Sequence, residues 1–375
     1  MISLWEKLSL IRKDIVIVGS GITGLSAAAY IKDQHPERKV TIIEQGLLPS
    51  GASTKNAGFA CFGSLSEIID DLFTLSEKEV VDLVSMRLDG LKILKSRIGE
   101  KMIDYQQNGG YELIGKNDTH YLEKMDYINE LLKPVFGTKC FDLADDQIDS
   151  FGFDSQSVAH LVYTPFEGQI DTGKMINTLL AYVRSRGVEI ITNGKVNDLY
   201  DSGEQVELLV NEQLKISANK VLVATNGFVS KLIPTVNINP GRGLVIATKP
   251  IDDLKFKGTF HMDKGYYYFR DFNKRLIFGG GRNLDFDTET TTDHGVNQLI
   301  MNELKRLMDQ VILPGISYEV DITWTGIMGF GQKKSATLEK YSENVAIGVG
   351  LGGMGVAIGS IIGEKLAILA LDENK

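Results

Sequence analysis

The chain has 375 residues, enough for two domains around a sizeable core. Its 40 basic and 49 acidic side chains give a formal net charge of −9, which argues against a nucleic-acid or anionic-membrane partner. The 24% of charged and 43% of hydrophobic residues are ordinary for a soluble globular protein and argue against disorder.

Cysteine and glycine usage narrows the class further. Cys61 and Cys140 are the two cysteines, so we expect no disulfide framework, no metal site and a cytoplasmic location. Residues 1–13 have no clean apolar core or small-residue cleavage site, so they do not predict a signal peptide. Residues 345–363 carry no charge and reach the length of a membrane span, but the many glycines among them and the charged residues directly after them argue against one.

The clearest early unit runs from Asp14 to Glu44. Residues 15–18 form a continuous apolar run that predicts a buried strand, residues 25–33 predict a helix, and residues 39–44 predict a second strand. Between the first strand and the helix lies the pattern G-x-G-x-x-G, formed by Gly19, Ser20, Gly21, Ile22, Thr23 and Gly24. The sequence therefore predicts a βαβ unit with a glycine-rich first turn.

The rest of the chain alternates between helical and strand patterns. Helices are predicted over residues 66–98, 121–132, 172–186 and 293–311, and strands over 188–191 and 195–199, in a hairpin over 206–223 and through most of 237–286. Residues 344–371 predict a last strand, a glycine-rich turn and a helix. Because the first and last units both look like pieces of one nucleotide-binding domain, we expect a second domain inserted into it, with a ligand at their junction.

The glycine pattern has a physical reading as a dinucleotide site. Gly19 permits the tight turn, Gly21 lets the backbone approach a pyrophosphate, and Gly24 allows the helix to pack closely on the strand. Glu44, followed by Gln45, ends the second strand 20 residues after Gly24, where a carboxylate can bind ribose hydroxyls and would repel the 2′-phosphate of NADP. FAD and NAD share this fingerprint, so it does not choose between them. The alternative is a glycine-rich turn that binds no ligand.

The segment after the second strand reads G-A-S-T-K-N-A-G over residues 51–58. Alone it would be a polar loop, but in this place it resembles the D-amino-acid oxidase and glycine oxidase family of FAD-dependent oxidoreductases. The resemblance implies that the segment lies beside the flavin and its diphosphate, with contacts from Ser53, Thr54, Lys55, Asn56, Ala57 and Gly58.

Further segments match the family in order along the chain. They are Gly168 to Asp171, Asn239 to Gly243, Trp324 to Gly326, and Gly350 to Gly355. The resemblance implies that Val196 touches the adenine side through its backbone, that Thr225, Asn226 and Gly227 lie over the cofactor, and that Gly352, Gly353, Met354 and Gly355 lie at the flavin ring. A helix N-terminus there would stabilise negative charge on the reduced ring. We expect non-covalent FAD, with a covalent link to Cys61 as the alternative.

The resemblance also implies the fold and its division. We expect an α/β fold with a Rossmann-like FAD-binding domain and an interleaved α+β substrate domain built on an antiparallel sheet. The FAD-binding domain would comprise residues 1–85, 160–232 and 322–375, and the substrate domain residues 86–159 and 233–321.

One departure from the family concerns the substrate. Members that oxidise amino acids carry an arginine shortly after W-x-G that grips the substrate carboxylate, and this chain has Met328 in that place. Either the substrate lacks an α-carboxylate, or another base such as Arg270, Arg242 or Lys333 supplies the contact. Residues 326–331 look more like the γ-glutamylputrescine oxidase branch, whose substrates are amines.

The aromatic run from Tyr266 to Arg270 is a second place to look for substrate contacts. Strand alternation puts Tyr267 and Phe269 on one face and Tyr266, Tyr268 and Arg270 on the other, so one face can form the floor of a pocket. We take Tyr267, Phe269, Arg270 and Met328 as pocket candidates, with sheet packing as the alternative. None of the five histidines has a metal-ligand or triad spacing, so no catalytic residue is assigned.

The sequence therefore predicts an FAD-dependent oxidoreductase, an enzyme that oxidises the C–N bond of a small amine or amino acid by hydride transfer to flavin. Reoxidation would be by oxygen or another acceptor. The alternative enzyme is a nicotinamide-dependent dehydrogenase that uses the same fingerprint, and a third possibility is a non-catalytic nucleotide-binding protein.

Overall fold

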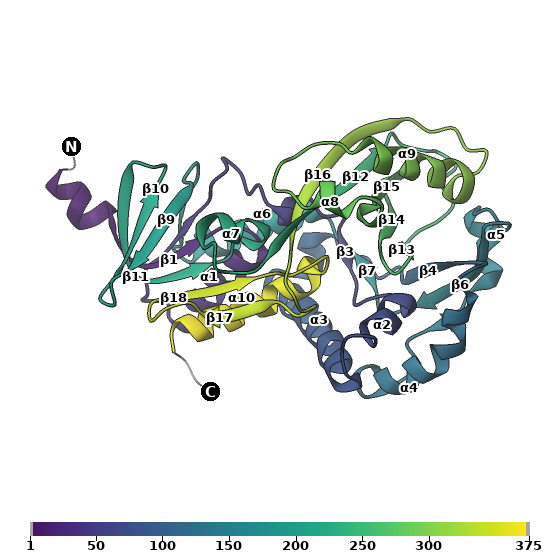
Figure 1. Ribbon diagram of the computed structural model, residues 1–375, viewed down its shortest axis with the longest axis horizontal. Helices are drawn as coiled ribbons and strands as arrows, with labels where there is room; N and C mark the ends of the chain where they lie inside the picture. Colours follow the sequence, from purple (N-terminus) through teal and green to yellow (C-terminus); the bar gives the residue numbers. More distant parts are fainter. Residues whose placement is uncertain (1–2, 373–375) are drawn as a thin grey trace.

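The computed structural model describes residues 3–372 and contains two large sheets that lie at opposite ends of the molecule (Figure 1). The first sheet has the order β17 (Thr337–Lys340), β18 (Val345–Val349), β11 (Leu214–Val223), β1 (Arg12–Val18), β2 (Val40–Ile43) and β8 (Glu189–Ile191). Strands β9 (Val196–Asp201) and β10 (Val206–Val210) extend it from β11. Its centre, from β18 to β8, is parallel, as the continuously apolar run in β1 predicts.

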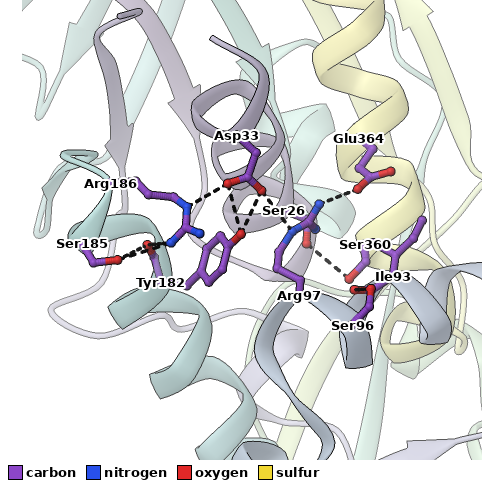
Figure 2. A network of polar contacts seen from close by, with 10 residues as sticks. All are labelled: Ser26, Asp33, Ile93, Ser96, Arg97, Tyr182, Ser185, Arg186, Ser360 and Glu364. Carbon is purple, nitrogen blue, oxygen red and sulfur yellow. Dashed lines mark hydrogen bonds and ion pairs between the residues drawn. The ribbon is translucent and has the colours of Figure 1, made fainter. Parts of the chain in front are cut away.

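Four helices cover one face of this sheet: α1 (Ile22–Gln34), α3 (Glu77–Ile98), α6 (Thr172–Ser185) and α10 (Gly355–Ala370). A polar network ties them together (Figure 2). Asp33 of α1 accepts hydrogen bonds from the hydroxyl of Tyr182 at 2.9 Å and from Nε of Arg186 at 2.8 Å. Arg97 of α3 is paired with Glu364 of α10. The C-terminal half of helix α3 is therefore tied to the other helices of this layer.

The opposite face of the first sheet is closed by the β9–β10 hairpin and by the short helix α7 (Val229–Leu232). Val16 and Val18 of β1 lie in one buried cluster with Val206 and Leu208 of the hairpin. Because successive strand residues point to opposite faces, a strand covered on both sides has no room for polar alternation. This explains why residues 15–18 are all apolar and no more than 5% exposed.

The second sheet carries the substrate domain. Its order is β16 (Val320–Phe330), β12 (Asn239–Thr248), β15 (Arg275–Gly280), β14 (Tyr267–Phe272), β13 (Thr259–Met262), β4 (Gly110–Gly115), β6 (Val158–Thr164) and β5 (Asp142–Leu143). All neighbouring pairs are antiparallel except β4 and β13. Its core-facing side packs on α5 (Ile148–Phe151) and α9 (Gln298–Leu307), with α8 (Phe286–Glu289) close to its edge. This arrangement confirms the predicted fold class.

Two helices join the domains. Helices α2 (Leu65–Asp71) and α4 (Met125–Phe136) share a buried cluster with residues of α3, β4 and β6. A small two-stranded sheet, β3 (Phe59–Ala60) with β7 (Gly168–Gln169), lies between the large sheets (Figure 1). The junction is therefore built from several separate crossings of the chain, as the predicted insertion requires.

Several expected boundaries differ from the structure. Strand β16 pairs with β12, so the boundary expected at residue 322 falls inside a substrate-domain strand, and β6 similarly contains residue 160. The helix expected over 66–98 is two helices, because Ser76 begins α3 with a capping box to Glu79. The helix expected from residue 293 begins at Gln298, after the cap residue Asn297.

Across residues 3–372, none of the helices is both long and apolar enough to cross a membrane. The uncharged window 345–363 is divided between strand β18 and the start of helix α10. Some of the glycines in this window form the turn between the strand and the helix.

Candidate active site

The residues predicted to contact the cofactor follow four neighbouring parallel strands at their carboxyl ends. The glycine fingerprint follows β1, Glu44 and Gln45 follow β2, Thr225 to Gly227 follow β11, and Gly352 to Gly355 follow β18. In open parallel sheets this edge is where ligands bind. The fold thus brings together segments that are more than 300 residues apart in sequence.

The fingerprint turn is tightly packed. Gly19 has a φ of +105°, and a Cβ built on it would lie 2.8 Å from the carbonyl oxygen of Ala224. A Cβ on Gly24 would lie 2.0 Å from the carbonyl oxygen of Gly19. Helix α1 begins at Ile22 and therefore starts directly against the turn. Ser20, Gly21 and Thr23 lie between the two closely packed glycines in the sequence.

Glu44 lies beside this turn, as its spacing predicts. Its side chain is buried, and one carboxylate oxygen accepts hydrogen bonds from the backbone N–H of Ser20 at 3.0 Å and from its hydroxyl at 2.7 Å. The other oxygen accepts from the N–H of Gly46 and from the hydroxyl of Ser50, both at 3.0 Å. The next residue, Gln45, is exposed. The carboxylate is thus held at the carboxyl end of β2 and cannot swing away from the turn without losing four hydrogen bonds.

The segment over residues 51–58 is fixed to the start of α1. The hydroxyl oxygen of Ser53 accepts a hydrogen bond at 2.9 Å from the N–H of Ile22, the first residue of that helix. Asn56 accepts from the N–H of Gly58 and from the hydroxyl of Thr172, both at 2.9 Å. The Ser53 hydroxyl therefore lies at the positive end of α1, where a phosphate would also bind.

Two further segments complete the edge. Asn226, with a φ of +45°, accepts hydrogen bonds from the N–H groups of Gly350 and Leu351, which fixes the glycine-rich loop before α10. Val196 begins β9, two residues after Gly194, whose N–H donates to the carbonyl of Glu44. Thr54 and Lys55 lie in the loop that carries Ser53, and Ala57 is buried there.

One polar atom at this edge lacks a partner. The buried hydroxyl of Thr225 makes no hydrogen bond within the protein, although a buried hydroxyl normally has one. It belongs to the segment that packs against Gly19 of the fingerprint turn. An unused donor beside a glycine turn, a helix N-terminus and a buried carboxylate fits the phosphate and sugar groups of FAD.

A cavity of about 420 Å³ opens between this edge and the substrate domain. On the cofactor side it is lined by Lys55, Asn56, Ala57, Gly350, Leu351, Gly352, Gly353 and Met354. On the substrate side it is lined by Tyr266, Tyr268, Arg282, Met328, Phe330 and Lys333, among others. The cavity therefore joins the segments expected at the flavin ring to the second sheet, and Met328 lies in it as expected.

The aromatic pocket candidates differ from the expectation. Tyr267 and Phe269 point into the substrate-domain core, with 6% and 0% of their surface exposed, and Phe269 stacks on Phe260. Their alternation partners Tyr266 and Tyr268 line the cavity instead. Burial raises the pKa of Tyr268 to about 12, so its hydroxyl stays protonated at neutral pH.

Two of the arginines expected to meet the substrate are engaged elsewhere. Arg270 is 2% exposed, and its Nη1 donates to the backbone carbonyls of Gly58 at 2.7 Å and Ile170 at 2.9 Å; burial lowers its pKa to about 10. Arg242 forms a two-pronged pair with the fully buried Glu289, with both N–O distances at 2.9 Å. Neither lines the cavity.

Sequence reasoning missed a buried pair at the cavity wall. Nε2 of His261 lies 3.0 Å from a carboxylate oxygen of Glu167, and both side chains are buried. Burial alone would lower the pKa of His261, but the carboxylates around it, first Glu167, raise it. The two residues are 94 positions apart and belong to no motif, so the sequence held no signal for the pair.

Cys61 lies close to that pair and offers a sulfur within 4.8 Å of their ligand atoms, a set that could hold a metal ion. Burial raises the pKa of the Cys61 thiol well above its usual range, which disfavours the thiolate that binds metals. Its sulfur lies 3.7 Å from that of Met354 in the loop expected at the flavin. The absence of a metal and of a covalent flavin link stay predictions.

Comparison with known proteins agrees with this geometry. The structure is similar to glycine oxidase from Geobacillus kaustophilus, with a TM-score of 0.78 and 18% identity over 97% of this chain and 96% of the other. It is also similar to L-proline dehydrogenase from P. horikoshii, with a TM-score of 0.77 and 16% identity over 97% and 94%. Iminodiacetate oxidase from Chelativorans sp. BNC1 gives a TM-score of 0.75 and 18% identity over 96% of each chain.

In sequence, a 40-residue stretch is 48% identical to thiamine thiazole synthase from Coprinopsis cinerea; it spans 11% of this chain and 13% of that protein. The DAO family model, described as FAD dependent oxidoreductase, matches residues 14–369. FAD is thus the cofactor, in place of the nicotinamide that the fingerprint alone allowed. With that match over nearly its whole length, the chain belongs to the DAO family of FAD-dependent oxidoreductases.

Proposed function

We propose that the protein oxidises the C–N bond of a small amine or amino acid. The observation that carries this proposal is the single cavity shared by the loop before α10 and the substrate sheet. In the reaction a C–H bond next to nitrogen breaks, the nitrogen loses a proton and a C=N bond forms. Water then hydrolyses the imine to a carbonyl compound and an amine or ammonia. When bound, FAD supplies the acceptor for the hydride, and the two electrons pass on to oxygen or another acceptor.

The chain's own residues orient the substrate and exclude water. Met328 and Tyr268 both lie next to Gly243, since a Cβ built on that residue would meet the methyl of Met328 at 3.1 Å and the hydroxyl of Tyr268 at 3.8 Å. Phe330 and Leu351 add further apolar surface to the lining. These apolar side chains, together with a lining in which basic residues outnumber acidic ones, favour a neutral amine over an ammonium ion, and only the neutral amine can give up hydride.

The loop before α10 is suited to the redox group. Helix α10 begins at Gly355, and Gly353 and Gly355 have no atom within 4 Å of where a Cβ would be. A helix N-terminus beside open space favours a ligand that gains negative charge. The contacts predicted for Gly352, Gly353, Met354 and Gly355 agree with this arrangement and remain proposals.

The names of similar structures support the substrate class. They are an oxidase named for glycine, one named for iminodiacetate and a dehydrogenase named for L-proline. Because both oxidases and a dehydrogenase occur among them, the electron acceptor is left open. The γ-glutamylputrescine oxidase branch stays a prediction that rests on residues 326–331.

Anaerobic reduction of the purified protein tests the proposal. We expect yellow protein whose flavin absorbance is bleached by at least one member of a panel of primary amines, secondary amines and amino acids of both configurations. Admitting oxygen and assaying hydrogen peroxide then separates an oxidase from a dehydrogenase. If the FAD-loaded protein is reduced by dithionite but by no amine or amino acid in the panel, the proposed reaction is wrong.

A further inference from the structure

One arginine in the cavity has no acidic partner. Arg282 follows β15 directly after Gly280 and Gly281, whose φ values of +123° and +77° turn the chain sharply. Its guanidinium carbon lies 4.1 Å from the centre of the Phe330 ring and 4.7 Å from that of Phe286. Within residues 3–372 its guanidinium forms neither an ion pair nor a hydrogen bond, and Glu289 attracts its charge only from beyond ion-pair distance.

The other buried arginines near the junction each have a protein partner, although Nε of Arg87 and Nε of Arg270 make no hydrogen bond. Arg242 is paired with Glu289, Arg270 donates to two backbone carbonyls, and Arg87 donates to a backbone carbonyl at 2.6 Å. A partly buried guanidinium normally finds such partners because leaving its donors unused costs free energy. Arg282 is held over an aromatic ring instead, with its donors directed at no protein group.

The cavity has an excess of basic side chains, although the whole chain is acidic. Its lining includes six basic residues, Lys55, Arg87, Lys264, Arg282, Lys333 and Lys334. It includes two acidic ones, and these are already neutralised: Glu67 lies 3.7 Å from Arg87, and Asp70 lies within 3.5 Å of both Lys264 and Lys334. The cavity is therefore suited to an anion rather than to a second cation.

We propose that Arg282, stacked on Phe330, binds a carboxylate of the substrate, so that the substrate is an amine that also carries a carboxylate. This inference rests on the proposed function. It answers the question raised by Met328, because a different arginine reaches the same cavity from the turn after β15. The planar guanidinium presents two parallel donors that match the two oxygens of a carboxylate, and the ring holds it flat.

The electrostatics support this assignment. Burial lowers the pKa of Arg282 from its ordinary value, because the charge is desolvated and the attraction of Tyr266 and Glu289 offsets this only in part. A bound carboxylate would supply the missing counter-charge. The stack is built into the backbone, since any Cβ at Gly241 would come within 2.4 Å of the Phe330 ring and 3.4 Å of the Arg282 guanidinium.

Calorimetric titration of the FAD-loaded protein with benzoate and with its neutral analogue benzamide tests the assignment. Wild type is expected to bind benzoate at least about tenfold more tightly than benzamide, as one charge-assisted pair would give. Arg282→Met is expected to abolish that preference, and Arg282→Lys to restore part of it, because a lysine keeps the charge but not the fork. Arg306→Met, a change of equal charge on the surface helix α9, should keep the preference.

Inorganic phosphate, titrated in parallel, distinguishes the class of anion. Tighter binding of phosphate than of benzoate, or an unchanged benzoate preference in Arg282→Met, would overturn the proposal. The heat of binding does not require flavin reduction, so a protein that binds benzoate through Arg282 but oxidises no amine would refute the proposed function alone. Melting temperature and FAD content, recorded for every variant, show that the variants are folded.

Discussion

Replacing Gly24 with alanine tests the fingerprint turn, because the structure leaves no room for a methyl group there. A Cβ on Gly24 would lie 2.0 Å from the carbonyl oxygen of Gly19, and real Cβ atoms essentially never come closer than 3.0 Å to another atom. The start of α1 must therefore move about 1 Å from the turn. Overpacking of this kind costs about 1–3 kcal/mol of folding free energy.

Gly24→Ala should also weaken FAD binding, by about as much free energy as it costs in folding stability. A hydrogen bond of about 2.9 Å that lengthens by about 1 Å is no longer a hydrogen bond. Losing one charge-assisted bond from the first turn of α1 to the diphosphate would cost about 1.5–3 kcal/mol, or roughly 10- to 100-fold in FAD affinity. Gly24→Ala should therefore purify with little flavin although it remains folded.

Reconstitution of apoprotein with FAD, followed by quenching of flavin fluorescence, measures this affinity. Ile300→Val is the matched control, because Ile300 is fully buried in the substrate domain and its shortening costs about 0.5–1.5 kcal/mol without touching the turn. If Gly24→Ala binds FAD as tightly as wild type, or if Ile300→Val weakens FAD binding as much, the assignment of the turn to the diphosphate is refuted.

Three further predictions concern single residues. Gly21→Ala should weaken FAD binding with little loss of stability, because its Cβ would meet only the Ser53 hydroxyl, at 2.9 Å, and that hydroxyl can rotate away; reconstitution and urea unfolding measure the two effects. Arg242→Met should lower the free energy of unfolding by about 3–5 kcal/mol, because it leaves the buried Glu289 without its counter-charge, and Arg242→Met with Glu289→Met should recover most of it; equal stability of the single and double variants would contradict this. His261 has its folded-state pKa raised above 6.5, so its contribution to stability is fully present below pH 6.5 and is lost as pH rises through the raised value; unfolding at a series of pH values should show a slope that His261→Gln removes.

Most of the cofactor site could be predicted from local sequence patterns. The apolar run of β1, the fingerprint glycines and Glu44 lie within one contiguous βαβ unit, so their spacing alone fixes their neighbours. The same holds for residues 51–58, which fold onto the start of α1. The parallel sheet then follows, because strands buried on both faces must be covered by helices and loops.

The residues on the substrate side of the cavity are placed by contacts between distant parts of the chain, which no local sequence pattern records. Alternation along β14 correctly separates Tyr267 from Tyr268, but the packing of α9 on the sheet decides which of the two faces the core. Likewise, His261 meets Glu167 only because β13 and the segment before β7 come together at the junction. These are long-range outcomes of domain packing.

The arginines show most clearly what the sequence determined and what the tertiary structure decided. The sequence by itself determined the cofactor-binding βαβ unit, the interleaved arrangement of its pieces and the loss of the family's usual arginine at Met328. Only the tertiary structure decided which remaining arginine is free, since Arg242 is neutralised by a residue 47 positions away and Arg270 donates hydrogen bonds to backbone carbonyls 100 and 212 positions away. Whether a buried charge has a partner depends on what lies within about 4 Å in space, and separation along the chain does not fix that distance.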